Sequence, residues 1–242
     1  MVRRKSVQRA RARGKGNEYL SGDPGLHHGP TPPYSPLHRP DAQRLIDAAF
    51  EFLSETGVDF DPVPDLMGRF RQAGCDVSAD GRVRIPVALI QKSIDSVAKS
   101  VRLWNRDGSA SIEVDCRHTW FVSGMTCIRV FDEESGEKRD STRDDLATAT
   151  RVSDALKNVD AVCVTCKNVE ASNIHGEIDE FSTLVENTTK PLLYLCEYAE
   201  SLGVVIDMAA AIRGGRQELA EKPYFMHVIT PLPCYYAKTH TD

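Results

Sequence analysis

The chain has 242 residues, of which 41% are hydrophobic and 27% are charged, and its formal net charge at pH 7 is -5. This composition is ordinary for a globular protein, and the acidic balance argues against nucleic acid as the main partner, since phosphate binding needs a basic face. No apolar run approaches the length of a membrane span, and the basic start lacks the apolar stretch of a secretion signal. We therefore expect a cytoplasmic protein with neither a nucleic-acid nor a membrane partner.

Residues 1–39 are predicted to be a basic, proline-rich arm. Such an arm could be a targeting peptide, a nucleic-acid contact or a solvated tail. Prolines at positions 30, 32, 33 and 36 disfavour both a helix and a central strand. We therefore expect a disordered tail.

Residues 40–100 are predicted to be a small helical cap. Pro40 begins a helix whose apolar residues recur at three–four spacing as far as Leu53, and Gly57 stands where a left-handed C-cap is expected. A second helix is predicted from Pro64 to Gly74, and a third from Pro86 to about residue 97. A turn at residues 80–81 and a short extended piece at residues 83–85 separate the last two helices.

Residues 101–242 are predicted to be a β-rich lead-in followed by the first half of a (β/α) barrel. Strands are expected near residues 101–103, 112–114, 120–122 and 128–131, and Ser135-Gly136 closes a hairpin. Thr142 and Asp145 then cap a helix that runs to about residue 157.

After this helix, apolar strands at residues 161–165, 192–195 and 225–229 alternate with two further amphipathic helices. Strand starts about thirty residues apart are typical of βαβ units. The expected fold class is α/β: a partial (β/α)8 TIM-type barrel of about four strands, preceded by the helical cap and the β-hairpin region.

The seven cysteines are an odd number and are scattered along the chain, which makes a disulfide framework a poor interpretation. Cys163 and Cys166 lie three residues apart inside an apolar strand. Positions three apart on a strand point to opposite faces, so these sulfurs are not expected to converge on one ion. We predict buried free thiols and no metal site.

Several short motifs occur in order between about residues 40 and 233. They are Ala-Gly-Cys-Asp-Val at 73–77, Arg-Ile-Pro at 84–86, Trp-Asn-Arg-Asp-Gly at 104–108, Phe-Val-Ser-Gly at 121–124, the Asp132, Gly136, Arg139, Thr142 and Asp145 series, Asn-Thr-Thr-Lys-Pro at 187–191 and Ile-Thr-Pro-Leu-Pro at 229–233. This ordered set resembles the N-terminal half of the trimethylamine methyltransferase family, which includes members that demethylate glycine betaine.

The resemblance implies transfer of a methyl group from a methylated amine, such as trimethylamine or a betaine, to a corrinoid (cobalamin) cofactor. In the family this corrinoid arrives on a separate protein, so no cofactor is expected to bind tightly to this chain and a corrinoid protein is the expected partner. Family members resemble a complete barrel of about twice this length. The alternative is therefore a truncated, inactive fragment or half-barrel that self-associates as a homo-oligomer, and we expect no methyl transfer by the chain alone.

The functional face of such a barrel lies at the carboxyl ends of its strands. Glu197 could face an ammonium group there or be a solvated loop acid, and Lys167 could contact substrate or simply be exposed. Four aromatic residues, Trp120, Tyr194, Tyr198 and Tyr235, are candidates for a cage around a methylammonium group, or else belong to the core or surface. No catalytic residue is identified. The candidate substrate-binding residues are Gly124, Lys167, Asn168, Glu170, Glu197 and Thr230.

Overall fold

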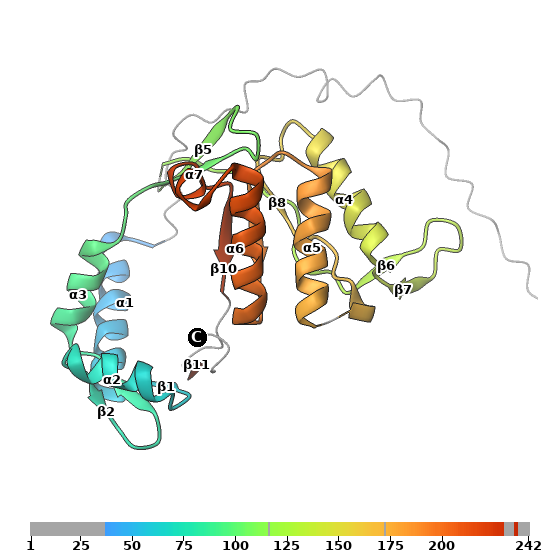
Figure 1. Cartoon of the computed structure of the whole chain (residues 1–242). Coiled ribbons are helices and arrows are strands. Elements are labelled where there is room, and N and C mark those ends of the chain that lie inside the picture. The colour runs from blue at the N-terminus through green and yellow to red at the C-terminus, as the bar shows by residue number, and fades with distance from the viewer. Residues whose placement is uncertain (1–36, 116, 172, 230–234, 237–242) are drawn as a thin grey trace, which may run out of the picture.

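The computed structural model describes residues 37–115, 117–171, 173–229 and 235–236, the last pair by backbone alone. Within these ranges the protein is mixed α/β, with seven α-helices and four small sheets (Figure 1). Residues 1–36 of the predicted disordered arm and the candidate residue Thr230 lie outside the described residues, whereas Arg39, which was predicted to belong to the arm, begins the first helix. In the part of the chain that the structure describes, no helix combines the length and apolarity needed to span a bilayer.

The cap contains the three predicted helices: α1 (Arg39–Glu51), α2 (Pro64–Gln72) and α3 (Val87–Ser96). The predicted end of the first helix at Gly57 is confirmed: α1 passes into a π-helix, η1 (Phe52–Thr56), and Gly57 ends it at a φ of 80°. Such a φ is readily adopted only by glycine.

The cap also holds a small sheet that the sequence indicated only in part. Its strands lie in the order β11-β1-β3-β2, from β1 (Val58–Phe60), β2 (Asp76–Val77), β3 (Arg82–Arg84) and β11 (Tyr235–Tyr236). Strand β11 runs parallel to β1, so the chain returns to the cap near its end. Strands of two or three residues are too short for an alternating pattern to be recognised.

Two antiparallel hairpins follow the cap in the sequence: β4 (Val101–Trp104) with β5 (Ser111–Val114), and β6 (Arg129–Phe131) with β7 (Lys138–Asp140). The strand predicted at residues 120–122 is not formed as a regular strand. Instead, residues 122–127 run beside the next strand through two isolated parallel bridges, Val122 to Ala161 and Cys127 to Cys166. Thr126 has a φ of 54°, which interrupts the regular ladder between the bridges.

The main sheet is parallel, with β8 (Val162–Cys163), β9 (Leu192–Leu195) and β10 (Phe225–Val228) in the order β10-β9-β8. Strand β8 is shorter than predicted because residues beyond it hydrogen-bond to the interrupted segment rather than to β9. The Thr126 and Cys127 amides donate to the carbonyl oxygens of Val164 and Thr165 at 2.6 and 2.9 Å.

Three helices form a layer over one face of this sheet: α4 (Arg143–Ala155), α5 (Ile174–Asn187) and α6 (Ala199–Arg213) (Figure 1). The predicted cap of α4 is confirmed, because Thr142 and Asp145 form a reciprocal capping box. A 3-10 turn, η2 (Val169–Ala171), precedes α5, and a short unpredicted helix, α7 (Arg216–Glu221), follows the Gly214-Gly215 end of α6.

The core lies between the sheet and this helix layer. It includes the fully buried side chains of Leu146, Val162, Phe181, Leu192 and Tyr194. Because side chains alternate along a strand, the neighbouring half-buried residues of β9 point to the opposite face. We call β8–β10 with α4–α7 the sheet unit.

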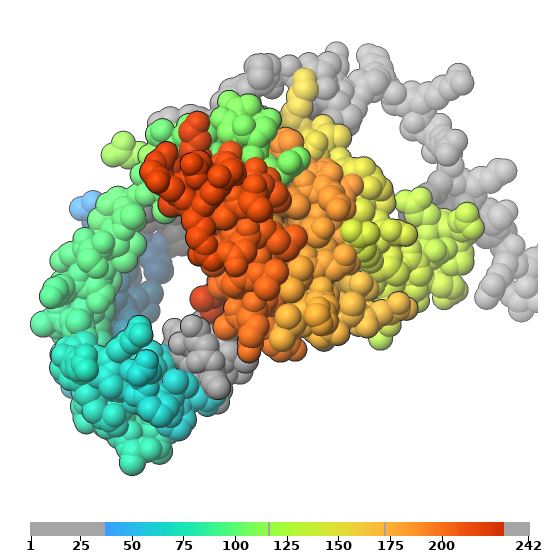
Figure 2. All heavy atoms as spheres, in the orientation of Figure 1, coloured from blue at the N-terminus to red at the C-terminus, as the bar shows by residue number. Residues whose placement is uncertain are grey.

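The hairpin β4–β5 meets the amino ends of β9 and β10. The Trp104 amide donates to the Pro223 carbonyl oxygen, and the Arg106 amide to that of Thr189, both at 2.7 Å. The cap is set apart from the sheet unit, and a gap separates it from α6 (Figure 2). The carboxyl ends of the parallel strands lie at the other end of the sheet unit, away from this hairpin.

Candidate functional site

An ion pair joins the carboxyl ends of β8 and β9. Lys167 Nζ lies 2.9 Å from Glu197 Oε1, and the lysine side chain is only 14% exposed whereas that of the glutamate is 59% exposed. Both residues were predicted from their places directly after the two strands. The structure brings them together because parallel neighbouring strands end at the same edge.

The backbone of Lys167 is fixed by the segment that leads into α4. Its amide donates to the Cys127 carbonyl oxygen at 2.9 Å. The buried Ser141 hydroxyl lies 2.5 Å from the Lys167 carbonyl oxygen and 3.0 Å from that of Cys127. Since Ser141 precedes the capping residue of α4, the start of this helix and the position of Lys167 are coupled.

Glu177, in the first turn of α5, lies under the end of β9. Its Oε1 accepts a hydrogen bond from the Glu197 amide at 2.7 Å, and its Oε2 accepts one from the Ser201 hydroxyl. The side chain is buried, but both oxygens are satisfied. A Cβ on the preceding Gly176 would overlap the Ala171 carbonyl oxygen, so only glycine lets α5 begin so close to this loop.

Glu180 lies one helical turn further along α5 and is 3% exposed. Its Oε1 accepts a hydrogen bond from the Asn168 amide at 3.1 Å, whereas its buried Oε2 has no hydrogen-bond partner among the described residues. Burial raises the pKa of this carboxyl to about 7, against the opposing effect of the Lys167 charge. An acid of this kind exchanges its proton near neutral pH.

The pKa of Lys167 is affected by the same group of acids. Burial disfavours its charged form, but the hydrogen bond to Glu197 and the charges of Glu180, Glu197 and Glu177 outweigh this and raise the pKa of Lys167. We call Lys167 and these three glutamates the carboxylate cluster. With three carboxyls around one ammonium, it is suited to holding a cation.

Glu177 and Glu180 were not among the residues predicted from the sequence. A signal was present, because both occupy the apolar side of the predicted helix, close to Ile174, Ile178 and Phe181. Acidic residues are rarely buried on such a face unless they have partners, so this pattern could have marked them.

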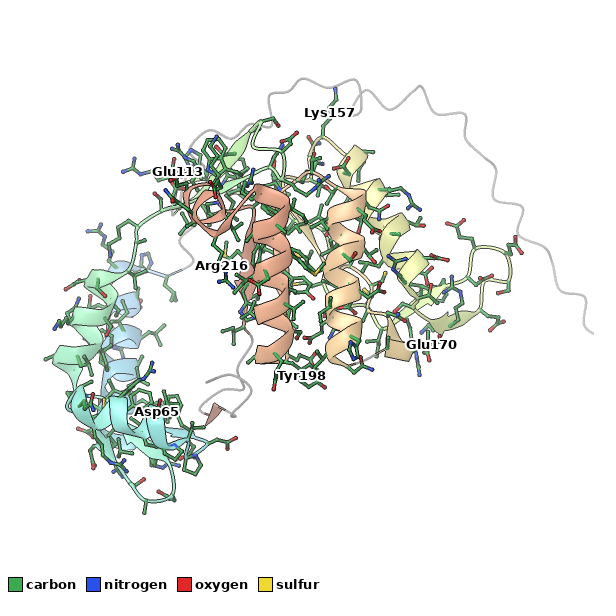
Figure 3. All side chains as sticks on the ribbon, in the orientation of Figure 1. Asp65, Glu113, Lys157, Glu170, Tyr198 and Arg216 are labelled. Carbon is green, nitrogen blue, oxygen red and sulfur yellow. The ribbon has the colours of Figure 1, made fainter. Side chains whose placement is uncertain are left out.

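The other predicted site residues take different places. Asn168 contributes its backbone amide to Glu180, and Glu170 is exposed on η2, at the same end of the molecule as Tyr198 (Figure 3). Gly124 lies beside the start of β8 rather than at its carboxyl end, since the neighbouring Ser123 amide donates to the Ala161 carbonyl oxygen. An added Cβ would meet nothing within 4 Å, and the positive φ of this segment falls on Thr126 instead of the glycine.

The aromatic candidates that the structure describes lie at different places in the fold. Tyr194 is buried against Phe181 and donates its hydroxyl hydrogen to the Glu177 carbonyl oxygen. Trp120 donates its indole N–H to the Glu113 carbonyl oxygen at 2.7 Å, next to the β4–β5 hairpin. Tyr198 precedes α6 at the carboxyl edge, and the side chain of Tyr235 lies outside the described residues.

The predicted buried thiols are confirmed. Cys163 and Cys166 are both buried and free, and burial raises the pKa of Cys163 to about 11. Within the described ranges, no group of three or more His, Cys, Asp or Glu side chains could hold a metal ion.

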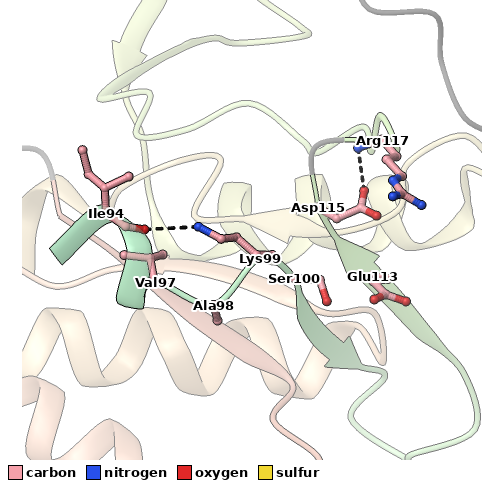
Figure 4. Close-up of a pocket in the computed structure, with 8 residues that line it drawn as sticks. All are labelled: Ile94, Val97, Ala98, Lys99, Ser100, Glu113, Asp115 and Arg117. Carbon is pink, nitrogen blue, oxygen red and sulfur yellow. Dashed lines mark hydrogen bonds between the residues drawn. The ribbon is translucent and has the colours of Figure 1, made fainter. Parts of the chain in front are cut away.

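A cavity of about 660 Å³ lies elsewhere, between the end of α3 and the end of β5 (Figure 4). Two of its charged side chains form hydrogen bonds with nearby backbone groups: Lys99 Nζ donates to the Ile94 carbonyl oxygen at 3.2 Å, and Asp115 accepts from the Arg117 amide at 2.8 Å. Glu113 and Lys157 mark this end of the molecule, opposite Glu170 and Tyr198 (Figure 3). We place the candidate site at the carboxylate cluster, because among the described residues it brings together buried charged side chains from several elements. The cavity is lined by Ile94, Val97, Ala98, Lys99, Ser100, Glu113, Asp115 and Arg117.

Comparison with known proteins gives one family and two curated relatives. The family model described as trimethylamine methyltransferase (MTTB) matches residues 3–241. The trimethylamine methyltransferase MttB of Desulfitobacterium hafniense (strain DSM 10664 / DCB-2) is 27% identical over 188 residues, which cover 76% of this chain and 37% of the relative. The glycine betaine methyltransferase of Desulfitobacterium hafniense (strain Y51) is 22% identical over 204 residues, or 83% of this chain and 42% of the relative. The chain thus spans about two fifths of the length of these relatives.

Proposed function

Because the chain belongs to the trimethylamine methyltransferase family, we propose that it forms the amine-binding part of an enzyme that transfers a methyl group from a methylated amine to a corrinoid. The observation that carries this proposal is the Lys167–Glu197 ion pair, backed by the buried Glu177 and Glu180 at the carboxyl edge of a parallel sheet. A site with excess carboxylate attracts an ammonium group, and the burial of its acids strengthens that attraction.

We also propose that the sheet unit is part of a (β/α)8 barrel. Its parallel strands lie side by side in chain order, and the helices that follow them cover one face. Both features are typical of such a barrel, whose sites lie at the carboxyl ends of the strands. The proposed division is an arm at residues 1–39, a cap at residues 40–100, and a lead-in with a partial barrel at residues 101–242.

The work of this chain's own residues is binding and positioning. Glu197 and Glu180 would hold the ammonium group, Lys167 and Asn168 would shape the edge of the site, and Glu170 and Gly124 would be peripheral. Thr230 is retained as a candidate from the sequence. Holding the amine in one orientation lowers the entropic part of the barrier to methyl transfer.

A corrinoid presented by a partner protein would supply the nucleophilic cobalt that accepts the methyl group, and the electron pair of the broken C–N bond would remain on the amine nitrogen. That a separate partner protein carries the corrinoid, with none bound tightly to this chain, is the part of the proposal that the family resemblance implies. A cytoplasmic location is part of the same proposal.

The alternative, an inactive half-barrel that associates with itself, has one supporting observation. The segment at residues 122–127 forms an edge of the sheet, and the large side chains of Phe121, Val122 and Met125 are exposed along it. Exposed apolar edges favour pairing with another chain. Sedimentation velocity tests this alternative, which requires a dimer or larger species and is contradicted by a stable monomer.

The proposed function is tested by measuring amine binding and methyl transfer separately. Saturation-transfer NMR on the methyl signals of trimethylammonium and glycine betaine reports binding to the chain. Absorbance of a corrinoid protein in its cobalt(I) state reports methylation. We expect binding of at least one amine, lost in Glu197→Gln and retained in the exposed control Glu200→Gln.

Methyl transfer would establish the activity and identify the amine. Binding without transfer would support the amine site and agree with our expectation that the chain alone is inactive. Failure of both measurements would contradict the proposed function.

A further inference from the structure

We propose that the Lys167 ammonium is an internal occupant of the amine site, and that a methylated ammonium cation displaces it from the carboxylate cluster. This inference rests on the amine-binding role proposed above and adds how the site is occupied before substrate enters. It also names the substrate class as a cation without a carboxylate of its own.

The first reason is chemical similarity. The head group of Lys167 is an alkylammonium, as a protonated methylamine is, and it already lies 2.9 Å from the Glu197 carboxylate. Its side chain is mostly buried at the end of β8. A binding site for an alkylammonium thus exists in the folded chain, and the chain fills it with its own lysine.

The second reason is that the cluster has more acceptor capacity than Lys167 uses. Glu177 is satisfied by the Glu197 amide and the Ser201 hydroxyl. Glu180, in contrast, keeps one buried oxygen without a hydrogen-bond partner among the described residues, although its carboxyl interacts with Lys167, Glu177 and Glu197. Buried polar atoms are normally paired, so this unpartnered oxygen points to a missing donor.

A tertiary methylammonium fits this oxygen better than a quaternary one. Trimethylammonium carries one N–H, which can be donated to Glu180 Oε2, whereas tetramethylammonium has no donor. A zwitterion is disfavoured for an electrostatic reason. When Lys167 has moved out, the cluster consists of carboxyls alone, and the carboxylate of glycine betaine would meet like charges.

The displacement is tested on the intact chain by lysine labelling. Acetic anhydride acetylates exposed amines, and mass spectrometry of peptides gives the rate at each lysine. We expect slow labelling of Lys167 in the free chain and faster labelling when trimethylammonium chloride is added. Exposed Lys157 is the internal control and should label at a constant rate. Unchanged or slower labelling of Lys167 overturns the proposal.

Affinity provides the second test. In Lys167→Met the internal competitor is gone, so the affinity for trimethylammonium should rise about tenfold, since a site that is open only part of the time binds with correspondingly reduced apparent affinity. The charge-matched control Lys157→Met should leave affinity unchanged. Glu180→Gln should reduce the preference for trimethylammonium over tetramethylammonium. Circular dichroism checks that each variant is folded.

Weaker trimethylammonium binding in Lys167→Met would overturn the proposal, as would selective loss of glycine betaine binding, which would make Lys167 a carboxylate ligand. The outcomes separate the two proposals. Amine binding with Lys167 still protected contradicts only this inference, whereas absence of amine binding and of methyl transfer contradicts the proposed function as well.

Discussion

The cap and the sheet unit contain similar amphipathic helices, but only the sheet unit builds a continuous core from them. Its buried cluster extends from Leu146 on α4 to Tyr224 before β10. The buried cluster of the cap consists of Met67, Cys75 and Val83. A helix buries its apolar stripe only where another layer covers it, and the parallel sheet is such a layer for α4–α6.

The first helix of the cap shows what happens without that layer. The sequence predicts an apolar face on α1, yet none of its residues is buried, and Leu45 is 60% exposed. The apolar pattern was sufficient to identify the helix. It was not sufficient to show that the face has a partner within the described part of the chain.

Matched leucine substitutions give the largest expected effect on this comparison. Leu146→Ala removes a fully buried side chain from the sheet unit and should reduce the free energy of unfolding by about 2–5 kcal/mol. Leu45→Ala, at an exposed position on α1, should change it by less than about 0.5 kcal/mol. Urea denaturation followed by circular dichroism measures both.

Equal losses in the two leucine variants would show that the face of α1 is covered in solution, and the contrast between the two regions would then be wrong. A small effect of Leu146→Ala would show instead that the core of the sheet unit is loosely packed.

The pH dependence of stability should come from the sheet unit, where the buried acids Glu177 and Glu180 both lie. Burial raises the pKa of Glu180 from 4.5 to about 7, so between these values the folded chain binds a proton that the unfolded chain releases. The contribution of Glu180 to stability is therefore present below about pH 4.5 and is lost as the pH rises to about 7. At about 1.4 kcal/mol per pKa unit, the loss reaches up to about 3 kcal/mol.

Glu180→Gln should remove this decline, since an amide does not titrate. The variant should gain stability relative to the native chain between pH 5 and pH 8, as measured by denaturation at several pH values. The control Glu200→Gln, at an exposed position, should follow the native profile. A native stability that rises over this range in parallel with Glu180→Gln would contradict the assignment of the pKa.

The smallest predicted effects concern the helix starts. Thr142→Ala removes the capping box of α4 and should cost about 1 kcal/mol. In the cap, His38 precedes α1 with extended backbone but makes no side-chain capping bond, so His38→Ser should stabilise α1 by up to about 1 kcal/mol. Hydrogen exchange of the two helices measures each change locally. A loss of stability in Thr142→Ala together with a gain in His38→Ser would support the contrast between the sheet unit and the cap. A loss of stability in His38→Ser would argue against it.

The sequence predicted most helices and the strands β9 and β10 correctly, because their apolar spacing and end signals are local. Thr142, Asp145 and the Gly57 and Gly214 ends are examples in which a few neighbouring residues set the boundary. The failures were the very short strands of the cap, the interrupted segment at residues 122–127, and helix α7. Each depends on pairing or on a backbone angle, such as that of Thr126, which residue type does not reveal.

Two of the four residues of the carboxylate cluster were predicted from the sequence. Lys167 and Glu197 were found because residues that follow parallel strands share one edge. Glu177 and Glu180 were missed because they lie on α5 and reach that edge only when the helix packs under it.

The sequence by itself determined the family and the local elements, because ordered motifs and apolar periodicity need no knowledge of distant contacts. Tertiary structure alone decided which charges meet. Lys167 and Glu197 are 30 residues apart in the chain, and the buried, partly unpartnered carboxyl of Glu180 exists only because packing removes it from water.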